Sequence, residues 1–453
     1  MNKEPEVSAV VVAHNDRQYL PGCIELLKQF LPVDHEIIVV DNDSTDGTGV
    51  WLSAQTFIKT IHEASDHGLY AAFNHGAKQA RGQYLLFMHS DVLLSREAYP
   101  RMKQCILEKN VCAVGGDSNR TRHYFGVHLP TYRDVNGFLS NATAYADAGL
   151  PVRPAIFLED FCLLMKRTAF EKVHGFDENF TGIGFGDGDL SLRLRRCGFD
   201  LMHVPVYVHH QGTGRSRTKE GYPLFLKNEQ YFQSKWGFSL MYSSNIRYEL
   251  LAKMDVSRPE LTVLDIGCSC GGNLMQIRYE NPTSQCYGIE LSKGAAKVAA
   301  QFGKVSHRNI EEVIAPEWKN KFDYIIMGDV IEHLRDPWRA IKNVAHWLAS
   351  GGAIITSVPN VLHISNLAQM LQGHWRYTSE GILDQTHLRF FTRESIEQLF
   401  VEAGLQVDSM ESIHARATSE QKALIHHLTS IPGVTLTENE MVAWQWAVVA
   451  HRR

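Results

Sequence analysis

The sequence predicts two consecutive α/β domains, each with a parallel sheet covered by helices on both faces. Strand-like apolar runs alternate with helix-like segments from residue 7 to residue 88, and the alternation starts again at residue 261. Each half also contains a strand-like run that ends in an aspartate and a turn rich in Gly, Ser or Asn, at residues 39–48 and 263–272. Parallel sheets place such turns at their carboxyl edge, where α/β folds bind ligands. We therefore expect two ligand sites on one chain.

Length and composition set the limits of this prediction. The chain has 453 residues, too many for one ordinary core, so two domains are the default and three are possible. We place the boundary near 240, giving domains at residues 1–240 and 241–453. The net charge of −5 gives no reason to expect a nucleic-acid partner.

Cysteine usage and hydropathy predict the compartment. The eight cysteines are scattered and show no zinc-ligand spacing, so we expect reduced thiols in a cytoplasmic protein. The polar N-terminus does not have the pattern of a signal peptide. No window approaches the roughly 20 apolar residues that span a bilayer, so any membrane contact is expected to be peripheral, at the inner face.

The expected elements follow from these periodicities. In the first half, strands are expected at residues 7–13, 36–40 and 84–88, and helices at 17–30 and 69–81. A basic loop is expected at residues 211–222, followed by a helical stretch at 224–254, and then by strands near 261–266, 285–290, 322–327 and 352–357.

Polar side chains follow the strands of the first half. Asp41 ends one strand, residues 65–76 open a helix, and Asp91 follows the buried strand at 84–88. A carboxylate can accept hydrogen bonds from a base or ribose, and oxygen ligands can hold Mg²⁺ or Mn²⁺ against a diphosphate. This equipment suits a nucleotide-diphosphate sugar.

These segments resemble the family 2 glycosyltransferases of GT-A fold, over residues 6–238. The resemblance implies that Asp41 contacts the nucleoside and that Asp91, the last carboxylate of a D-x-D motif, binds the metal. His89 stands where the first Asp of that motif usually is. The expected donor-binding residues are Asp41, Asp66, Asn74, Ser90 and Asp91.

The acceptor side of the same family resembles residues 175–193, which match a G-F-D-E…E-D-x-D-L-x-x-R signature. The match implies that Asp187 is the catalytic base, which takes the acceptor hydroxyl proton in an inverting transfer. Gly186 replaces the usual preceding Glu. Asp189 is expected to begin a helix and to pair with Arg193 one turn later. Helix capping or structural pairing is the alternative role for Asp187.

A further metal ligand is implied by the family's H-x-x-G motif. His209 matches its histidine, and His210 would point to the opposite face of a strand. A structural histidine is the alternative. The basic side chains of the loop could close over the diphosphate or simply be solvated; they are Arg215, Arg217 and Lys219.

The turn at residues 263–272 carries the second candidate site. Gly267 and Gly271 permit positive φ and close approach to a ligand, and Asp265 ends the preceding strand. The next strand ends in Glu290, an acid placed to accept hydrogen bonds from ribose hydroxyls.

These motifs resemble class I S-adenosylmethionine-dependent methyltransferases of Rossmann-like fold, over residues 245–453. The resemblance implies that Asp265 and Gly267 line the methionine end of the cofactor, that Glu290 binds its ribose, and that Asn309 and Ile310 flank its adenine. Ser269 replaces a common middle Gly. The expected cofactor-binding residues are Asp265, Gly267, Cys268, Gly271, Glu290, Asn309, Ile310 and Asp329.

The methyl acceptor side is expected to include residues 329–333, which resemble a D-V-L-E-H segment, and residues 384–391. Methyl transfer requires in-line alignment and often little else. If a base assists, His333 and His387 are the candidates, with structural packing as their alternative role.

The leading hypothesis is therefore a bifunctional enzyme that transfers a sugar and also methylates a glycan or sugar. The acceptor is expected to be a glycan or a lipid-linked or protein-linked sugar, and the oligomeric state is left open. Two alternatives remain: one domain is catalytic and the other is a binding module, or the chain is a non-catalytic scaffold of a polysaccharide assembly complex.

Overall fold

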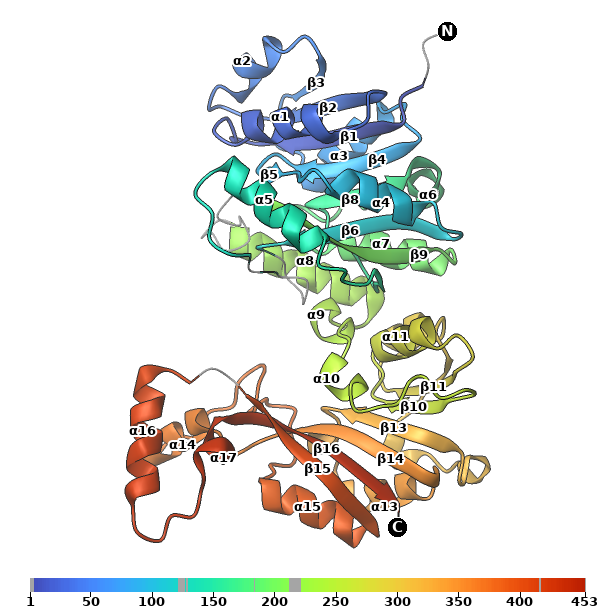
Figure 1. The fold of residues 1–453 in the computed structure, drawn as a ribbon, viewed down its shortest axis with the longest axis vertical. Helices are drawn as coiled ribbons and strands as arrows, with labels where there is room; N and C mark the ends of the chain where they lie inside the picture. Colours follow the sequence, from blue (N-terminus) through green and yellow to red (C-terminus); the bar gives the residue numbers. More distant parts are fainter. Residues whose placement is uncertain are drawn as a thin grey trace. The chain divides into compact units, whose positions relative to one another are not determined.

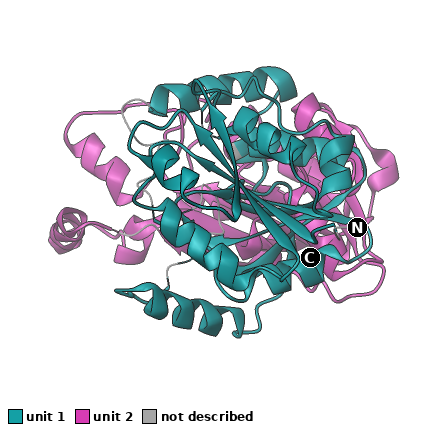
Figure 2. Cartoon of the chain, turned by 90° about the horizontal axis from the view of Figure 1, so that it is seen from above, with its two compact units in different colours: residues 1–245 teal, residues 246–453 magenta. Residues whose placement is uncertain are grey.

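The computed structural model describes residues 4–120, 127, 129–182, 184–211, 221–414 and 417–452. Internal contacts divide the chain into two compact units, Met1–Asn245 and Ile246–Arg453, coloured separately in Figure 2. The division falls close to the expected boundary near 240.

The first unit contains a mixed sheet with the strand order β3-β2-β1-β4-β8-β6-β9-β5, in which β7 also pairs with β9 (Figure 1). The strands from β3 to β4 are parallel, whereas β8 runs antiparallel to both β4 and β6. The strands are β1 (Val7–Ala13), β2 (His35–Asn42), β3 (Ile58–Glu63), β4 (Tyr84–His89), β5 (Val92–Leu93), β6 (Val111–Ser118), β7 (Arg153–Pro154), β8 (Cys162–Lys166) and β9 (Asp200–His210).

Strand β8 corrects the prediction of a wholly parallel sheet. Leu163, Leu164 and Met165 are all buried, so this strand has the continuous apolar run that is typical of a strand covered on both faces. Such a run reports burial and carries no information about direction. The α/β architecture with helices on both faces stands.

Most helices of the first unit pack against this sheet. Helix α1 begins at Leu20, later than expected, and Pro21 lies in its first turn, where a missing N–H costs nothing. The helices are α1 (Leu20–Phe30), α2 (Thr48–Ser53), α3 (Leu69–Lys78), α4 (Ala98–Ile106), α5 (Val135–Ala146), α6 (Arg167–Lys172), α7 (Gly186–Arg196), α8 (Gly221–Trp236) and α9 (Leu240–Ser243).

The second unit contains a sheet with the order β12-β11-β10-β13-β14-β16-β15. The first five strands are parallel, and β16 runs antiparallel to its neighbours β14 and β15. The strands are β10 (Thr262–Ile266), β11 (Gln285–Glu290), β12 (Lys304–His307), β13 (Phe322–Gly328), β14 (Leu348–Pro359), β15 (Leu405–His414) and β16 (Ala443–Arg452).

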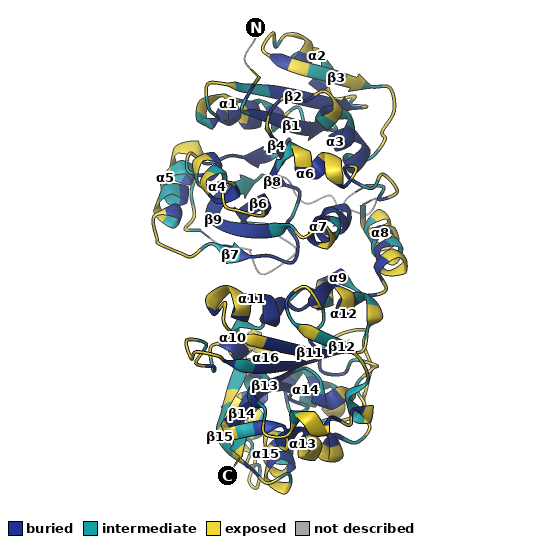
Figure 3. Ribbon diagram, turned by 90° about the vertical axis from the view of Figure 1, so that its right-hand side faces the viewer, coloured by how far each residue is buried: buried dark blue, intermediate teal, exposed yellow. Residues whose placement is uncertain are grey.

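Helices again cover this sheet, and residues of β10, β11, β13, β14 and β16 contribute to the buried interior of the unit (Figure 3). The helices are α10 (Tyr248–Leu251), α11 (Gly272–Glu280), α12 (Lys293–Ala299), α13 (Pro337–Ala345), α14 (Ile364–Leu371), α15 (Arg393–Glu402), α16 (Ser419–Ser430) and α17 (Glu438–Val442), with 3₁₀ turns η2 (Ile310–Glu312), η3 (Pro316–Trp318) and η4 (Ile331–His333). Within the described ranges, no helix combines the length and apolar character needed to cross a membrane.

The close packing of α3 on the first sheet generates a stability prediction. A Cβ added at Gly76 would lie 2.3 Å from Val10 Cγ1 and 3.2 Å from Val40 Cγ2. We expect Gly76→Ala to destabilise the protein by about 1–3 kcal/mol, because overpacking outweighs the better helix propensity of Ala. Urea unfolding would measure this. Lys78→Ala, at an exposed position of the same helix, should stay within about 0.5 kcal/mol of wild type. A Gly76→Ala protein as stable as wild type would contradict the packing argument.

Candidate active sites

Asp41 lies at the carboxyl end of β2 and is buried. Its Oδ1 accepts a hydrogen bond from the Ser44 backbone N–H at 3.2 Å, and its Oδ2 lies 3.2 Å from His62 Nδ1 on the neighbouring strand β3. The carboxylate thus shapes the turn that follows β2 and also remains at the sheet edge where α/β folds bind ligands.

Two of the expected donor-binding residues have clear structural partners. Asp66 Oδ1 accepts hydrogen bonds from Asn42 Nδ2 and the Gly68 backbone N–H, at 2.6 and 2.8 Å. The Asn74 amide exchanges two 2.9 Å hydrogen bonds with the backbone of Phe176 and donates to the Glu178 side chain. Asn74 therefore joins α3 to the loop at residues 175–178.

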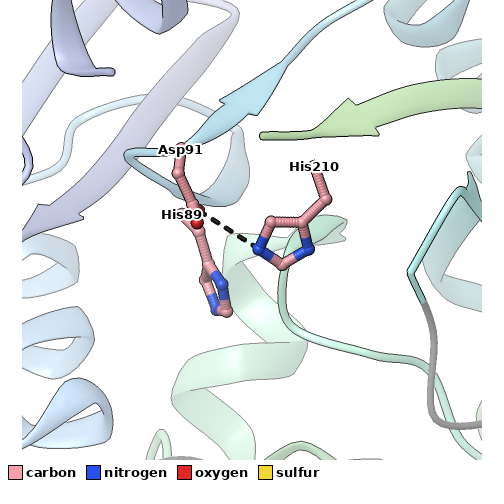
Figure 4. A group of neighbouring side chains, drawn as sticks. All are labelled: His89, Asp91 and His210. Carbon is pink, nitrogen blue, oxygen red and sulfur yellow. Dashed lines mark ion pairs between the residues drawn. The ribbon is translucent and has the colours of Figure 1, made fainter. Parts of the chain in front are cut away.

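Beside these residues lies a group that could hold a metal ion: His89, Asp91 and His210 (Figure 4). Each offers one ligand atom, and these atoms lie within 4.8 Å of one another. His89 ends β4, Asp91 precedes β5 and His210 ends β9, so three strand ends meet here. His210 Nε2 lies 3.2 Å from Asp91 Oδ1. Ser90 is buried, and its hydroxyl donates to Asp16 Oδ2 at 2.5 Å.

The charge balance of this group favours an ionised carboxylate. Burial alone raises the pKa of Asp91, but the hydrogen bond and charge of His210, together with the charge of His89, lower that pKa to about 2. The buried Nδ1 of His210 has no hydrogen-bond partner among the described residues. A carboxylate and imidazole nitrogens form a donor set that suits a divalent transition metal.

His209, the expected metal ligand, lies elsewhere. Its Nδ1 contacts the Tyr132 hydroxyl, and its ring packs beside Phe138. Burial and the charge of His210 lower the pKa of His209. Side chains alternate along a strand, so only one of the two adjacent histidines can face Asp91, and in the structure that residue is His210.

His209 lines a cavity of about 510 Å³, which adjoins the metal-ligand group through the neighbouring residues of β9. Gln211 lines it, and its backbone N–H donates to the Asp91 carbonyl at 2.8 Å. Asn119 also lines it, and its side chain forms two hydrogen bonds with the His210 backbone. Aromatic side chains contribute much of the apolar wall; they are Tyr132, Phe138, Tyr207 and His209.

Asp187 is buried in the first turn of α7, and its Oδ1 accepts the Gly188 backbone N–H at 2.9 Å. The helix is preceded by Phe185 with φ of +69°, a strained conformation for a bulky residue. A Cβ at Gly186 would lie 2.5 Å from the Tyr70 ring. Tyr70 therefore fills the space beside Gly186.

The expected pairing of Asp189 with Arg193 is confirmed, at 2.8 Å. Trp236 Nε1 and Lys235 Nζ also bind this buried carboxylate, at 2.9 and 2.6 Å. Helix α8 is thus fixed onto α7, beside Asp187. The basic residues Arg215, Arg217 and Lys219 lie outside the described residues.

In the second unit, the turn after β10 has the backbone that its glycines predict. Gly267, Ser269 and Gly271 have φ of +72°, +49° and +82°. A Cβ at Gly267 would lie 2.7 Å from Val330, and one at Gly271 would lie 2.9 Å from the Ala299 backbone. The glycines therefore serve the conformation of the turn and its packing. Cys268 is buried within the same turn.

Two buried carboxylates flank this turn. Glu290 Oε2 accepts the Ser269 N–H at 2.8 Å, and its Oε1 accepts the Ser292 N–H at 2.7 Å. Asn273 Nδ2 donates to Asp265 at 3.1 Å. Burial, followed by the charge of Glu290, raises the pKa of Asp265 to about 7.

The remaining expected cofactor residues have local partners. Asn309 caps η2 by accepting the Glu311 N–H at 3.0 Å, and Ile310 begins that turn. Asp329 forms an ion pair with Arg247 and accepts from Ser357 and Gln445, at 2.9 and 2.7 Å. Arg247 also binds Asn273 through its backbone N–H, which connects Asp329 to the surroundings of Asp265.

Glu332, His333 and His387 form a second group with ligand atoms within 4.8 Å of one another. Burial, followed by the charge of Asp329, raises the pKa of Glu332 well above its usual value. Burial and the charge of His387 lower the pKa of His333, which favours a neutral imidazole. The two expected histidines therefore lie together, with Glu332 as an unexpected third member.

Comparison with known proteins defines the class of each unit. Residues 8–173 match the model "Glycosyl transferase family 2", and residues 161–215 match "N-terminal domain of galactosyltransferase". Residues 242–410 match the model "Methyltransferase domain". The two units are therefore group-transfer domains. The first contains a family 2 glycosyltransferase domain, and the second contains a methyltransferase domain.

Individual relatives agree with this division. The O-antigen biosynthesis protein RfbC of Myxococcus xanthus is 28% identical over 47% of this chain and 18% of its own length. A ubiquinone biosynthesis O-methyltransferase of Idiomarina loihiensis is 32% identical over 22% of this chain and 42% of its own length. The chain spans less than half the length of the first curated relatives it matches.

A solved mannosyltransferase of Pyrobaculum calidifontis, in complex with GDP-Man and Mn²⁺, is 19% identical over 49% of this chain and 59% of its own, with a TM-score of 0.36.

Sequence reasoning assigned no ligand-binding role to His210, Glu332 or Arg247. The alternation of side chains in β9 gave a signal for His210, since it excluded one of the two histidines. Glu332 gave little signal, because its partner His387 comes from a loop 54 residues after His333.

The buried Asp265 generates a pH prediction. Its pKa is about 7 in the folded protein and 3.8 ordinarily, so the folded state binds this proton more tightly. The resulting stability is complete below pH 3.8 and is lost as pH rises through about 7. Between pH 5 and pH 8, we expect the ligand-free wild-type protein to lose about 2–4 kcal/mol more of its free energy of unfolding than the Asp265→Asn variant loses. Urea unfolding at both pH values would measure it.

The exposed Glu397→Gln is the matched control and should retain the pH dependence of wild type. Equal pH dependence in Asp265→Asn and wild type would contradict the assignment.

Proposed function

We propose that the chain is a bifunctional transferase of polysaccharide biosynthesis. Its first domain transfers a sugar from a nucleotide-diphosphate donor with inversion, and its second transfers a methyl group from S-adenosylmethionine to a glycan or sugar. The observation that supports this most strongly is that each unit holds buried carboxylates at the carboxyl edge of its parallel strands, within a matched transferase domain.

The donor would bind at the first sheet edge. Asp41 would accept hydrogen bonds from the nucleoside, and His89, Asp91 and His210 would hold a divalent metal, with His210 in the role first expected of His209. Their nitrogen donors favour Mn²⁺ over Mg²⁺, which prefers oxygen ligands. Bound there, the metal would supply positive charge to the leaving diphosphate. Asp66 and Ser90 would support this edge, and Asn74 would position the acceptor loop.

The acceptor would bind beside the metal, in the cavity walled by Tyr132, Phe138 and Tyr207. Aromatic faces cover the apolar face of a sugar ring, and polar side chains of the same wall can bind its hydroxyls. Asp187 would take the proton of the attacking hydroxyl. A glycan, a lipid-linked sugar or a protein-linked sugar fits this chemistry; a lipid-linked sugar would bring the enzyme to a membrane surface as a peripheral protein.

S-adenosylmethionine would bind at the turn after β10. Its methyl group is activated by the sulfonium, so the protein contributes mainly orientation. Gly267, Cys268 and Gly271 would let the backbone approach the methionine end, where Asp265 lies. Glu290 has spare lone pairs for the ribose hydroxyls, and Asn309, Ile310 and Asp329 would border the adenine and the reacting end.

A glycan is the methyl acceptor that the surroundings of His387 favour. The Phe390 ring lies 6.5 Å from the His387 ring and 5.2 Å from Trp375, and Tyr377 lies 6.4 Å from Phe390. Trp375 and Tyr377 are exposed, at 40% and 56%. Exposed aromatic rings grouped beside polar side chains are typical of ligand-binding grooves, and sugars stack on such rings.

The choice between the two adjacent histidines generates a prediction for the metal. We expect His210→Ala to weaken Mn²⁺ binding at the first unit by about a hundredfold, because one of three protein ligands is lost. His209→Ala is the matched control and should leave Mn²⁺ affinity unchanged, because His209 faces the cavity. Isothermal titration of the full chain with Mn²⁺ would measure both. A larger loss in His209→Ala than in His210→Ala would overturn the assignment.

The bifunctional proposal is tested by a reciprocal pair of variants. Incubation with a panel of nucleotide sugars, a glycan extract and labelled S-adenosylmethionine would follow both groups. We expect Asp187→Asn to lower sugar transfer by about 10²–10⁴-fold and to leave methyl transfer intact. We expect Glu290→Gln to weaken S-adenosylmethionine binding by about tenfold and to leave sugar transfer intact.

A variant without effect on its own activity would reduce that domain to a binding module. Wild-type protein that moves neither group to any acceptor would exclude the bifunctional enzyme.

A further inference from the structure

The group of Glu332, His333 and His387 is built as a site. Glu332 and His333 come from η4, directly after β13, whereas His387 comes from the loop before α15. The backbone carbonyl of Glu332 accepts the N–H groups of Leu388 and Arg389, at 2.8 and 3.0 Å. These two bonds hold the loop against η4, so the three side chains are brought together by the backbone.

Both imidazoles are oriented by backbone oxygens. His387 Nδ1 lies 2.9 Å from the carbonyl oxygen of Ile382, and His333 Nδ1 lies 3.3 Å from that of Thr386. A neutral imidazole that donates through Nδ1 keeps a free lone pair on Nε2. Histidines that bind metals usually have such a second partner, because it fixes the tautomer and the ring orientation.

The third member of the group, Glu332, is a buried carboxylate that a bound cation would stabilise. The Glu332 side chain is 1% exposed, and neither carboxylate oxygen has a hydrogen-bond partner among the described residues. The nearby Arg247 guanidinium instead pairs with Asp329 and Glu249. Burying a carboxylate without a partner costs several kcal/mol, whereas a bound cation removes that cost.

We propose that Glu332, His333 and His387 bind a divalent transition-metal ion, and that its open coordination positions bind the hydroxyl of the sugar acceptor that is methylated. Two imidazoles and one carboxylate leave positions free on such an ion. This inference rests on the proposed methyl-transfer function and makes that step metal-dependent. It also replaces the role of His333 and His387 as separate bases.

An ion held by these three residues would lower the pKa of the acceptor hydroxyl, whose proton would leave to water. The oxygen then attacks the methyl carbon of S-adenosylmethionine; the O–CH₃ bond forms as the S–CH₃ bond breaks, and S-adenosylhomocysteine leaves with the sulfur electron pair. A sugar is a suitable ligand because adjacent hydroxyls can occupy two positions of one ion.

The site's place in the fold agrees with this role. Glu332 follows the end of β13, which pairs with β10 and is therefore at the same sheet edge as the cofactor turn. Arg247 contacts Asp329 from one side and Asn273, the partner of Asp265, through its backbone. The exposed rings beside His387 extend from the site in the direction of solvent.

The test is a count of Mn²⁺ ions bound by the full-length protein, measured by equilibrium dialysis with electron paramagnetic resonance of free Mn²⁺. We expect Glu332→Gln and His387→Gln each to lower the count by one equivalent. Glu332→Gln is nearly isosteric and removes a buried carboxyl that has no hydrogen-bond partner among the described residues, so it should fold at least as well as wild type. His346→Gln, at an exposed position after α13, is the matched control and should keep the full count.

Two further readouts separate this site from the others. Asp91→Asn should remove a different equivalent, so that Asp91→Asn combined with Glu332→Gln removes both. S-adenosylmethionine affinity should remain within about twofold of wild type in Glu332→Gln. Wild-type protein that binds Mn²⁺ but not S-adenosylmethionine would sink the proposed methyl transfer, and with it the acceptor role, but leave the metal site standing. Glu332→Gln and His387→Gln proteins that keep the full count would overturn the metal site itself.

Discussion

Burial of carboxylates at the carboxyl edges of parallel strands is the constraint on which both units depend. A carboxylate removed from water is costly unless hydrogen bonds or opposite charges replace the water. Asp41 and Glu290 meet this need with backbone N–H groups of the turns that follow their strands, Glu290 also with the Ser269 N–H of the turn after β10, and Asp91 meets it with His210. The conformations of these turns are therefore tied to the carboxylates, and the ligand edge of each sheet is shaped before any ligand binds.

The hydrogen-bond partners of each side chain separate residues that hold the site together from residues that can still bind a ligand. Asn74 and Asp329 are at the sites, but protein partners occupy much of their hydrogen-bonding capacity. In contrast, His210 Nδ1 and both Glu332 oxygens are buried and lack hydrogen-bond partners in the described part of the chain. Sequence motifs do not make this distinction, since both kinds of residue occur within them.

The sequence could predict several of the strands because burial on both faces produces nearly continuous apolar runs, as in Val7–Ala13 and residues 84–88. It could not predict the direction of β8, because burial has no direction. Nor could it decide between His209 and His210. Alternation shows that they face opposite sides, but the register of β9 against β6 shifts between Gly115 and Asp117, and only the folded pairing fixes which side each one faces. The proximity of Glu332 and His387 depends on backbone hydrogen bonds between η4 and a loop distant in the sequence. Such a contact leaves no periodic pattern in the sequence.

The two candidate metal-binding groups, each of one carboxylate and two imidazoles, are assembled in different ways. In the first unit, three strand ends converge, so the sheet itself sets the spacing of His89, Asp91 and His210. In the second unit, the spacing of Glu332 and His387 depends on two hydrogen bonds between η4 and a loop. The chemistry differs in the same way. In the proposed sugar transfer the leaving group is an anionic nucleoside diphosphate, so a cation there would stabilise the leaving group. In the proposed methyl transfer the leaving group is the neutral thioether S-adenosylhomocysteine, so a cation would help only the attacking hydroxyl. A site for the second role would therefore lie on the acceptor side of the cofactor, and the exposed rings beside His387 support that position for the proposed metal.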